Sequence, residues 1–269
     1  MEFLPQLLAL VVTGVFAGLL AGLLGVGGGI VIVPVLFFLF QGFGVSADSA
    51  QIIATATSLA TIIPTSISSI RAHTRKGNVD FALLKYWVVF VFIGVMAGSL
   101  MVTRVDGTYL TALFGIIATL SALNMLFRAG AKPLKNELPG RVGQGIMGSC
   151  IGFFSTMVGI GGGTLTVPTL TACNYPAHRA VGTAAAVGLM ISLPGALTLL
   201  VAANTPVDAP KFTYGLVNLV AFVCIVPLTV LFAPLGAALA QKLDQKKLKR
   251  VFAVALMVTG VRMLLQLVL

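Results

Sequence analysis

The chain has 269 residues, of which 58% are hydrophobic and only 9% are charged, and its mean hydropathy is +1.06. So little polar surface excludes a soluble globular domain and indicates a helical protein that crosses a membrane several times. The net charge of +10 would suggest nucleic-acid binding in a soluble protein, but here the basic residues lie between apolar runs, where they set membrane topology, and we expect no nucleic-acid partner.

Apolar runs follow one another along the whole chain. The first, residues 3–24, has neither a basic start nor a cleavage site, so we expect it to be retained rather than removed as a signal peptide. Most runs are long enough to cross a hydrocarbon core of ~30 Å, whereas 30–40 and 164–174 reach only ~16 Å and can go halfway. The runs are 3–24, 30–40, 51–70, 81–102, 108–127, 142–158, 164–174, 180–202, 213–240 and 248–268.

Two glycine runs interrupt this pattern at corresponding places in the two halves of the chain. The first is Gly25-Val26-Gly27-Gly28-Gly29 before Val33-Pro34, and the second is Gly159-Ile160-Gly161-Gly162-Gly163 before Val167-Pro168. Glycine costs about 1 kcal/mol per residue in a helix, so each run predicts a broken helix. The alternative is that these small residues only allow helices to pack closely in the membrane.

The glycine runs belong to a longer internal repeat. A shift of 134 residues superposes the two runs and also carries Gly14, Gly18, Pro34 and Leu36 onto Gly148, Gly152, Pro168 and Leu170. Later in each half the shift becomes 138, which carries Gly98, Arg104, Asp106, Phe114, Asn124, Met125 and Leu126 onto Gly236, Lys242, Asp244, Phe252, Arg262, Met263 and Leu264. We therefore predict two repeats, residues 1–135 and 136–269, within one integrated membrane domain.

The basic residues indicate that both glycine runs turn the chain back to the side from which it came. In that topology one side of the membrane holds 14 of the 17 basic residues, and if the second run crossed instead, the split would be 10 against 7. The positive-inside rule favours the first arrangement. The 14 residues are Arg71, Arg75, Lys76, Lys85, Arg128, Lys132, Lys135, Arg141, Arg179, Lys242, Lys246, Lys247, Lys249 and Arg250.

The predicted fold is therefore an all-α, polytopic membrane protein built from two inverted repeats, each with one broken, re-entrant helical hairpin and three transmembrane helices. The protein is expected in the cell (inner) membrane, with the loops at 71–80, 128–141 and 241–250 in the cytoplasm. Both termini are expected on the outer side of this membrane. The first arm, 3–24, must tilt or lie partly in the interface if its tip is to stop near the middle of the membrane.

The short arms point to an anion site. A helix that starts at the glycines has free N–H groups and roughly +0.5 of a charge at its beginning, which suits an oxyanion. Two such ends in corresponding places are typical of a transporter's central site. The candidate substrate-binding residues are Gly27, Gly28, Gly29, Gly161, Gly162 and Gly163, with hydroxyl donors at Thr57, Ser58, Thr164 and Thr183; these hydroxyls could instead bond their own helices.

Arg262 is a cation away from both ends of the apolar run 248–268. Arg262 could bind substrate, or its side chain could reach back to the membrane surface. No carboxylate falls within a run, and neither a metal cluster nor a catalytic pair of side chains is present there, so we expect no enzyme activity, no metal site and no cofactor. Cys150, Cys173 and Cys224 lack the spacing of a disulfide framework or a zinc site.

Several further motifs accompany the two glycine runs: Gly18-Leu19-Leu20, Ala56-Thr57-Ser58-Leu59-Ala60, His73, Gly77-Asn78-Val79-Asp80 and His178-Arg179-Ala180-Val181-Gly182-Thr183-Ala184. In these motifs the sequence resembles the TauE/SafE family of sulfite exporters, also called the 4-toluene sulfonate uptake family. The resemblance implies export or uptake of small sulfur-containing anions such as sulfite or sulfoacetate. It covers nearly the whole chain, but Ala184 stands where the first half has Ser58.

We therefore predict a secondary transporter in the lipid bilayer that moves a small sulfur oxyanion or organosulfonate by alternating access. One alternative is an importer of thiosulfate-like compounds that uses Cys150 or Cys173 as thiol contacts. Another is a membrane scaffold subunit that transports nothing. The sequence leaves the substrate, the direction, the coupling ion and the oligomeric state open.

Overall fold

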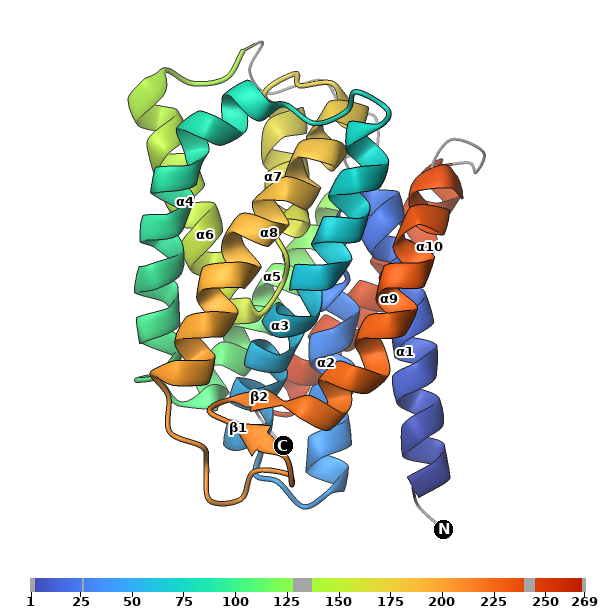
Figure 1. Ribbon diagram of the computed structural model, residues 1–269, viewed down its shortest axis with the longest axis vertical. Helices are drawn as coiled ribbons and strands as arrows, with labels where there is room; N and C mark the ends of the chain where they lie inside the picture. Colours follow the sequence, from blue (N-terminus) through green and yellow to red (C-terminus); the bar gives the residue numbers. More distant parts are fainter. Residues whose placement is uncertain (1–2, 26, 128–136, 240–244, 268–269) are drawn as a thin grey trace.

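The structure is a computed structural model that describes residues 3–25, 27–127, 137–239 and 245–267. Within these ranges the chain forms ten helices and one two-stranded ribbon (Figure 1), so the prediction of a mainly helical protein is confirmed. The helices are α1 Phe3–Leu24, α2 Gly29–Gly42, α3 Ala47–Thr74, α4 Phe81–Val102, α5 Gly107–Phe127, α6 Arg141–Val158, α7 Gly163–Ala172, α8 Ala177–Val201, α9 Leu219–Leu239 and α10 Gln245–Leu265; the strands are β1 Thr213–Tyr214 and β2 Val217–Asn218.

Five of the helices are long and apolar enough to cross a membrane: α3, α4, α5, α8 and α9. α3 is the most buried of them inside the protein, whereas less than half of α4, α5 and α9 is buried. Large apolar side chains such as Phe92 and Leu231 are exposed on these outer helices. In a chain of this hydropathy such surfaces face lipid. α3 therefore lies in the interior of a membrane-embedded bundle.

Hydrogen bonds between distant loops define the two ends of the bundle. At one end, Asp208 accepts hydrogen bonds from Ser46 N and Ser49 Oγ, and Asp48 accepts one from Thr108 N. At the other end, Arg179 donates to Asp80. We call these the Asp208 end and the Asp80 end. Since α3 starts beside Asp208 and finishes just before Asp80, it runs the full length of the bundle.

The two helical hairpins approach from opposite ends of the bundle. α1 and α2 form the first, and α2 finishes at the Asp208 end, where Gln266 Nε2 donates to Gln41 Oε1. α6 and α7 form the second, which starts at the Asp80 end, where Tyr86 Oη donates to Arg141 O. α7 finishes at that same end (Figure 1).

Each hairpin packs mainly on a helix from the other half of the chain. α1 packs along α9, α6 packs along α4, and α3 and α8 pack against each other, as do α5 and α10. Glycines permit these contacts: a Cβ added at Gly22 would lie 1.9 Å from Ala233 O, and one added at Gly94 would lie 2.0 Å from Ser149 O. Such close approach through small residues is typical of helices packed in membranes.

Two expectations from the sequence are wrong in detail. Run 213–240 is not helical throughout, because β1 and β2 form a short hairpin around Gly215, whose φ of +52° suits a turn, and α9 begins only at Leu219. The first arm does not stop near the middle: Gly22 O lies 3.2 Å from His73 Nε2, in the last turn of α3. The tip of the first hairpin therefore lies nearer the Asp80 end.

Several predictions fall on parts of the chain that the structure leaves out. The boundary between residues 135 and 136 lies outside the described residues. So do Val26, Arg128, Lys132, Lys135, Lys242 and Asp244. Around them, α5 ends and α6 begins, and α9 ends and α10 begins, at the Asp80 end (Figure 1).

Candidate functional site

The two glycine runs meet inside the bundle. A Cβ added at Gly27 would lie 3.4 Å from Gly161 Cα, and one added at Gly29 would lie 2.6 Å from Gly159 O. The two turns therefore touch backbone to backbone, with no space for side chains between them. Gly27, Gly28 and Gly159 have φ values of +71°, +79° and +71°, which glycine adopts without strain.

The tips of the turns pass this meeting point and reach helices of the opposite half. A Cβ added at Gly25 would lie 2.3 Å from Val181 O, in the second turn of α8. One added at Gly159 would lie 2.8 Å from Thr55 Cα, near the start of α3. Each glycine tip is thus held by the first helix that follows the hairpin of the other half.

Two helices begin at the meeting point. α2 starts at Gly29, directly after the left-handed Gly28, and α7 starts at Gly163, where Thr166 N donates to Gly162 O. The first N–H groups of a helix have no partner within it and carry the positive end of the helix dipole. Both positive ends therefore lie in the interior of the bundle, as an anion site would require.

Three of the predicted hydroxyl groups already have protein partners. Ser58 Oγ donates to Gly159 O at 2.7 Å and so ties α3 to the second glycine turn. Thr57 Oγ1 accepts a hydrogen bond from Asn218 N, and Thr183 Oγ1 accepts one from Asp80 N. The hydroxyls of Thr57 and Thr183 thus contact the residue that precedes a helix of the opposite half.

The fourth predicted hydroxyl, that of Thr164, is buried without a hydrogen-bond partner among the described residues. The hydroxyls of Ser66 on α3, Ser155 on α6 and Thr166 on α7 are also buried without a partner among the described residues, and none of them was predicted from the sequence. A buried hydroxyl without a partner costs ~1–3 kcal/mol. The sequence signal that was available is position: Ser66 lies two turns after Ser58 on α3.

Ser66 lies beside the second glycine turn. A Cβ added at Gly188 on α8 would lie 3.1 Å from Ser66 Oγ and 3.6 Å from Gly162 N. The place where a side chain at position 188 would stand therefore lies between a free hydroxyl and the backbone of Gly162. We call this place the Gly188 gap. The two groups beside it, a hydroxyl and a backbone N–H, are of the kind that donates a hydrogen bond.

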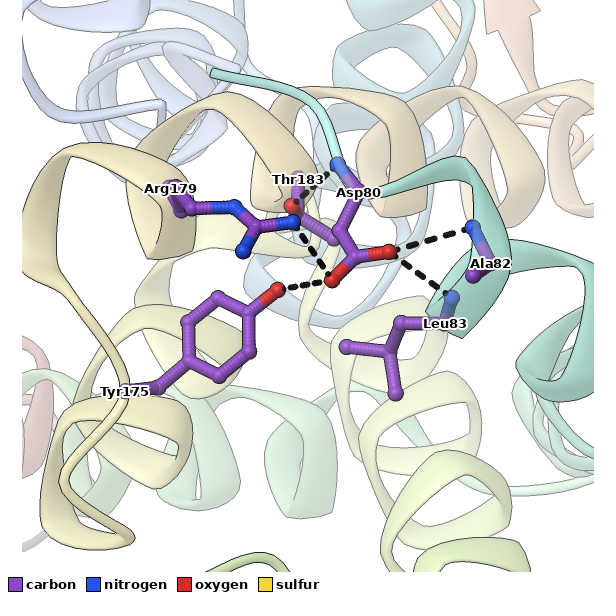
Figure 2. Close-up of polar contacts among 6 residues, drawn as sticks. All are labelled: Asp80, Ala82, Leu83, Tyr175, Arg179 and Thr183. Atoms are coloured by element: carbon purple, nitrogen blue, oxygen red, sulfur yellow. Dashed lines mark hydrogen bonds and ion pairs between the residues drawn. The ribbon is translucent and has the colours of Figure 1, made fainter. Parts of the chain in front are cut away.

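A second polar arrangement, the Asp80 cluster, lies at one end of the bundle and consists of Asp80, Tyr175, Arg179 and Thr183 (Figure 2). Asp80 accepts hydrogen bonds from the Tyr175 hydroxyl and, at 3.0 Å, from Arg179 Nη2, and its other oxygen accepts from the N–H groups of Ala82 and Leu83. The Arg179 guanidinium lies 5.6 Å from the centre of the Tyr175 ring. The cluster joins the α3–α4 loop to Tyr175, between α7 and α8, and to the first two turns of α8.

These contacts shift two pKa values. Burial alone would raise the pKa of Asp80, but the hydrogen bonds from Tyr175 and Leu83 and the charge of Arg179 outweigh it and place that pKa below its ordinary value. Burial, together with the bond to Asp80, raises the pKa of Tyr175 to about 12. Asp80 is therefore ionised and Tyr175 is protonated at neutral pH.

The remaining candidates lie away from the glycine turns. Arg262 is exposed on α10, and its guanidinium lies 4.4 Å from the centre of the Phe38 ring. Phe38 itself lies about 14 Å along α2 from Gly29, where the helix begins. Cys150 is exposed, and Cys173 and Cys224 are half-buried. Among the described residues no group of three His, Cys, Asp or Glu side chains could hold a metal ion.

Known proteins similar to this chain carry the name of probable membrane transporters. The profile of the family described as "Sulfite exporter TauE/SafE" matches residues 10–263. A "Probable membrane transporter protein" of Haemophilus influenzae is 30% identical over 97% of this chain and 98% of its own length. The "Probable membrane transporter protein MJ0441" of Methanocaldococcus jannaschii is 30% identical over 98% and 97%.

A third relative is the "Probable membrane transporter protein YunE" of Bacillus subtilis, which is 29% identical over 95% of this chain and 96% of its own length. No solved structure matches the chain. The likeness to these relatives extends over nearly the full length of both partners.

Proposed function

Because this chain belongs to the sulfite exporter TauE/SafE family of membrane transporters, we propose that it carries a small sulfur-containing anion, sulfite or an organosulfonate such as sulfoacetate, across the cell membrane. The observation that carries this proposal is the meeting of the two glycine turns, where the positive ends of α2 and α7 lie in the interior next to unpartnered hydroxyls. An oxyanion with several acceptor oxygens suits such donors better than a cation does.

The substrate site would lie at the Gly188 gap. Ser66 Oγ and Gly162 N border it, and Thr164 follows the same glycine turn with an unpartnered hydroxyl. Neutral donors stabilise an anion without burying a charge that would have to be compensated when the site is empty. The glycine triplets Gly27–Gly29 and Gly161–Gly163 serve this site by bringing the two helix ends together.

We further infer that the two halves are inverted repeats that work by alternating access. Crossed contacts between corresponding residues support this: Thr57 bonds to Asn218, which caps α9, and Thr183 bonds to Asp80, which caps α4. The hairpins also approach from opposite ends. Such symmetry around a central site is typical of secondary transporters.

We place the Asp80 end in the cytoplasm and both termini outside. Arg71, Arg75, Lys76 and Arg179 lie at that end, in agreement with the positive-inside rule. A membrane potential that is negative inside favours the exit of an anion by ~2.3 kcal/mol per charge per 100 mV, so the potential alone could drive export without a coupling ion.

The proposal is tested with purified protein in liposomes, by following the flux of sulfite, sulfoacetate, thiosulfate, sulfate and chloride. We expect flux of a sulfur-containing anion and none of chloride. Gly188→Ala should reduce this flux because the added methyl group fills the gap between Ser66 Oγ and Gly162 N. Gly195→Ala is the matched control, since the same methyl group on α8 would meet only the carbon atoms of Leu59, Thr156 and Val95, at 3.3–3.6 Å.

Thr164→Val tests the unpartnered hydroxyl without changing the shape of the side chain. Loss of one hydrogen bond to a charged ligand should weaken anion binding roughly 10- to 100-fold. Thr171→Val, whose hydroxyl bonds only its own helix, should bind the anion normally. If a well-folded wild-type protein moves none of the anions, or if Gly188→Ala and Gly195→Ala behave alike, the proposed site is wrong.

A further inference from the structure

A groove of about 410 Å³ lies between α3 and α9, away from the glycine turns. Its walls are apolar at Pro64, Ile67, Val230 and Pro234 and basic at Arg71 and Arg75. Along α3 the groove is thus apolar at Pro64 and Ile67 and basic at Arg71 and Arg75, and the wall that α9 contributes is apolar. It does not belong to the Asp80 cluster or to the Gly188 gap.

Two prolines explain why α3 and α9 leave this space. Pro64 lies inside α3 and Pro234 inside α9, and a proline within a helix removes one N–H and its hydrogen bond to the carbonyl four residues earlier. At Pro234 that carbonyl is Val230 O, and Ser68 Oγ of α3 donates to it at 3.0 Å. The groove is therefore a built feature whose floor is fixed by a bond between the two helices.

The charged end of the groove lacks a counter-charge. Arg71 and Arg75 are one helical turn apart on the same face of α3, and like charges at this spacing repel. In the part of the chain that the structure describes, the only salt bridge joins Arg179 to Asp80, so neither arginine has a carboxylate partner. Lys76, the next cation, donates to Ala237 O of α9 and adds positive charge to this end.

The position of the groove matches the depth profile of a lipid. Arg75 is the residue after the end of α3, at the Asp80 end, and Pro64 lies about 16 Å further in along the helix axis. Ile67 in the groove and Leu231 and Leu235 next to it on α9 are exposed, and exposed leucines on this helix face hydrocarbon. The groove therefore offers cations near the membrane surface and an apolar wall below them.

We propose that the α3–α9 groove binds an anionic phospholipid of the leaflet at the Asp80 end. The phosphate lies between the guanidinium groups of Arg71 and Arg75, which bind tetrahedral oxyanions in a forked geometry. The first methylene groups of an acyl chain lie along Pro64, Ile67 and Pro234. With the shift of 126 that pairs Ser58 with Ala184, Arg71 and Arg75 correspond to Leu197 and Val201 on α8. Only one leaflet therefore supplies this ligand.

The test uses the full chain in detergent, with native mass spectrometry and thermal unfolding after addition of phosphatidylglycerol, phosphatidylcholine or inorganic phosphate. We expect phosphatidylglycerol to stay bound and to raise the unfolding temperature, and the other two to do neither. The double variant Arg71→Gln, Arg75→Gln should bind phosphatidylglycerol roughly 10- to 30-fold more weakly, because each basic group near an anionic surface contributes about fivefold.

Two further variants keep the result interpretable. Arg104→Gln removes an exposed cation at the Asp208 end and should bind phosphatidylglycerol like the wild type. Arg71→Lys, Arg75→Lys keeps both charges and should regain part of the binding, which a merely misfolded variant would not. Unchanged phosphatidylglycerol binding in the double glutamine variant, or equal stabilisation by inorganic phosphate, would overturn the proposal. Neither result depends on anion flux, so the transport proposal is tested separately.

Discussion

Asp80 shows how one residue joins the two halves of the chain. Its carboxylate caps α4 through the N–H groups of Ala82 and Leu83 and also accepts hydrogen bonds from Tyr175 and Arg179 of the second half (Figure 2). Its own N–H donates to Thr183. The side chain therefore caps α4 and also binds the second half of the chain, and both contacts require an acceptor, which an acidic residue provides.

Asp80→Asn should lower the unfolding temperature of the purified protein, because the neutral amide still caps α4 but loses the ion pair with Arg179 and its strong bond to Tyr175. The lowered pKa of Asp80 means that its ionised form stabilises the folded state above the ordinary value of 3.8, and that this stabilisation is lost as the pH falls through the folded-state pKa. The difference in unfolding temperature between wild type and Asp80→Asn should thus be present at pH 7 and should disappear below about pH 3.8.

The control for this measurement is Asp106→Asn, which changes an exposed acidic residue in the loop before α5. A difference between wild type and Asp80→Asn that stays constant from pH 7 to pH 3, or that equals the effect of Asp106→Asn, would show that the charge at position 80 does not matter.

At this scale the sequence predicts Thr57 and Thr183 as donors to a substrate, and that role stays a prediction. In the structure both hydroxyls accept hydrogen bonds from backbone N–H groups, a contact that the sequence did not predict. Their partners, Asn218 and Asp80, lie in the other half of the chain. Hydrophobic pattern and repeat spacing contain no information on such crossed contacts.

Among the elements, the glycine turns are the most constrained. Gly25 has a φ of +66°, and a Cβ there would lie 2.3 Å from Val181 O, so both its own backbone and the neighbouring helix require glycine. Gly44 has a φ of +85° but open space around it. The two positions share the backbone strain that alanine would introduce and differ only in the clash.

Gly25→Ala should therefore destabilise the protein clearly more than Gly44→Ala, which should cost only ~1 kcal/mol for its positive φ. The additional loss of unfolding free energy in Gly25→Ala measures the contact between the first glycine turn and α8. Unfolding of both variants in the same detergent gives this difference, and equal losses of stability would mean that Val181 is not where the structure places it.

The sequence predicted the broken hairpins because glycine runs inside apolar segments are a strong local signal. The two short arms end close to where they were expected, at Gly42 and Ala172. The β1–β2 ribbon was missed, since its two-residue strands at Thr213–Tyr214 and Val217–Asn218 are too short for a period-2 pattern and continue an apolar run. The reach of α1 was also missed, because its length is set by packing on α9.

For the whole molecule, the topology makes a prediction about exposure on the two sides of the membrane. Val207 is fully exposed at the Asp208 end, and Thr74 is exposed at the Asp80 end. In a variant whose three native cysteines are replaced, Val207→Cys should react with a membrane-impermeant maleimide from outside the cell. Thr74→Cys should react only after the cells are permeabilised.

The opposite labelling pattern would reverse the orientation, and labelling of both sites from the same side would exclude the six-crossing arrangement. Reporter enzymes fused to the two termini give an independent test. An enzyme that is active only outside the cytoplasm should be active at both termini, and one that is active only in the cytoplasm should be inactive at both. The charge pattern alone predicted this arrangement, because basic residues near the ends of the helices are a signal that the chain itself carries.

The contact between Gly27 and Gly161 also imposes an order of events on synthesis. The second residue leaves the ribosome 134 positions after the first, which takes ~7–27 s at ~5–20 residues per second. During that interval the N-terminal hairpin has no counterpart, so it must wait at the translocon or be shielded by lipid. Final closure of the bundle is therefore a late step, and a truncated N-terminal half should be a substrate for membrane quality-control proteases.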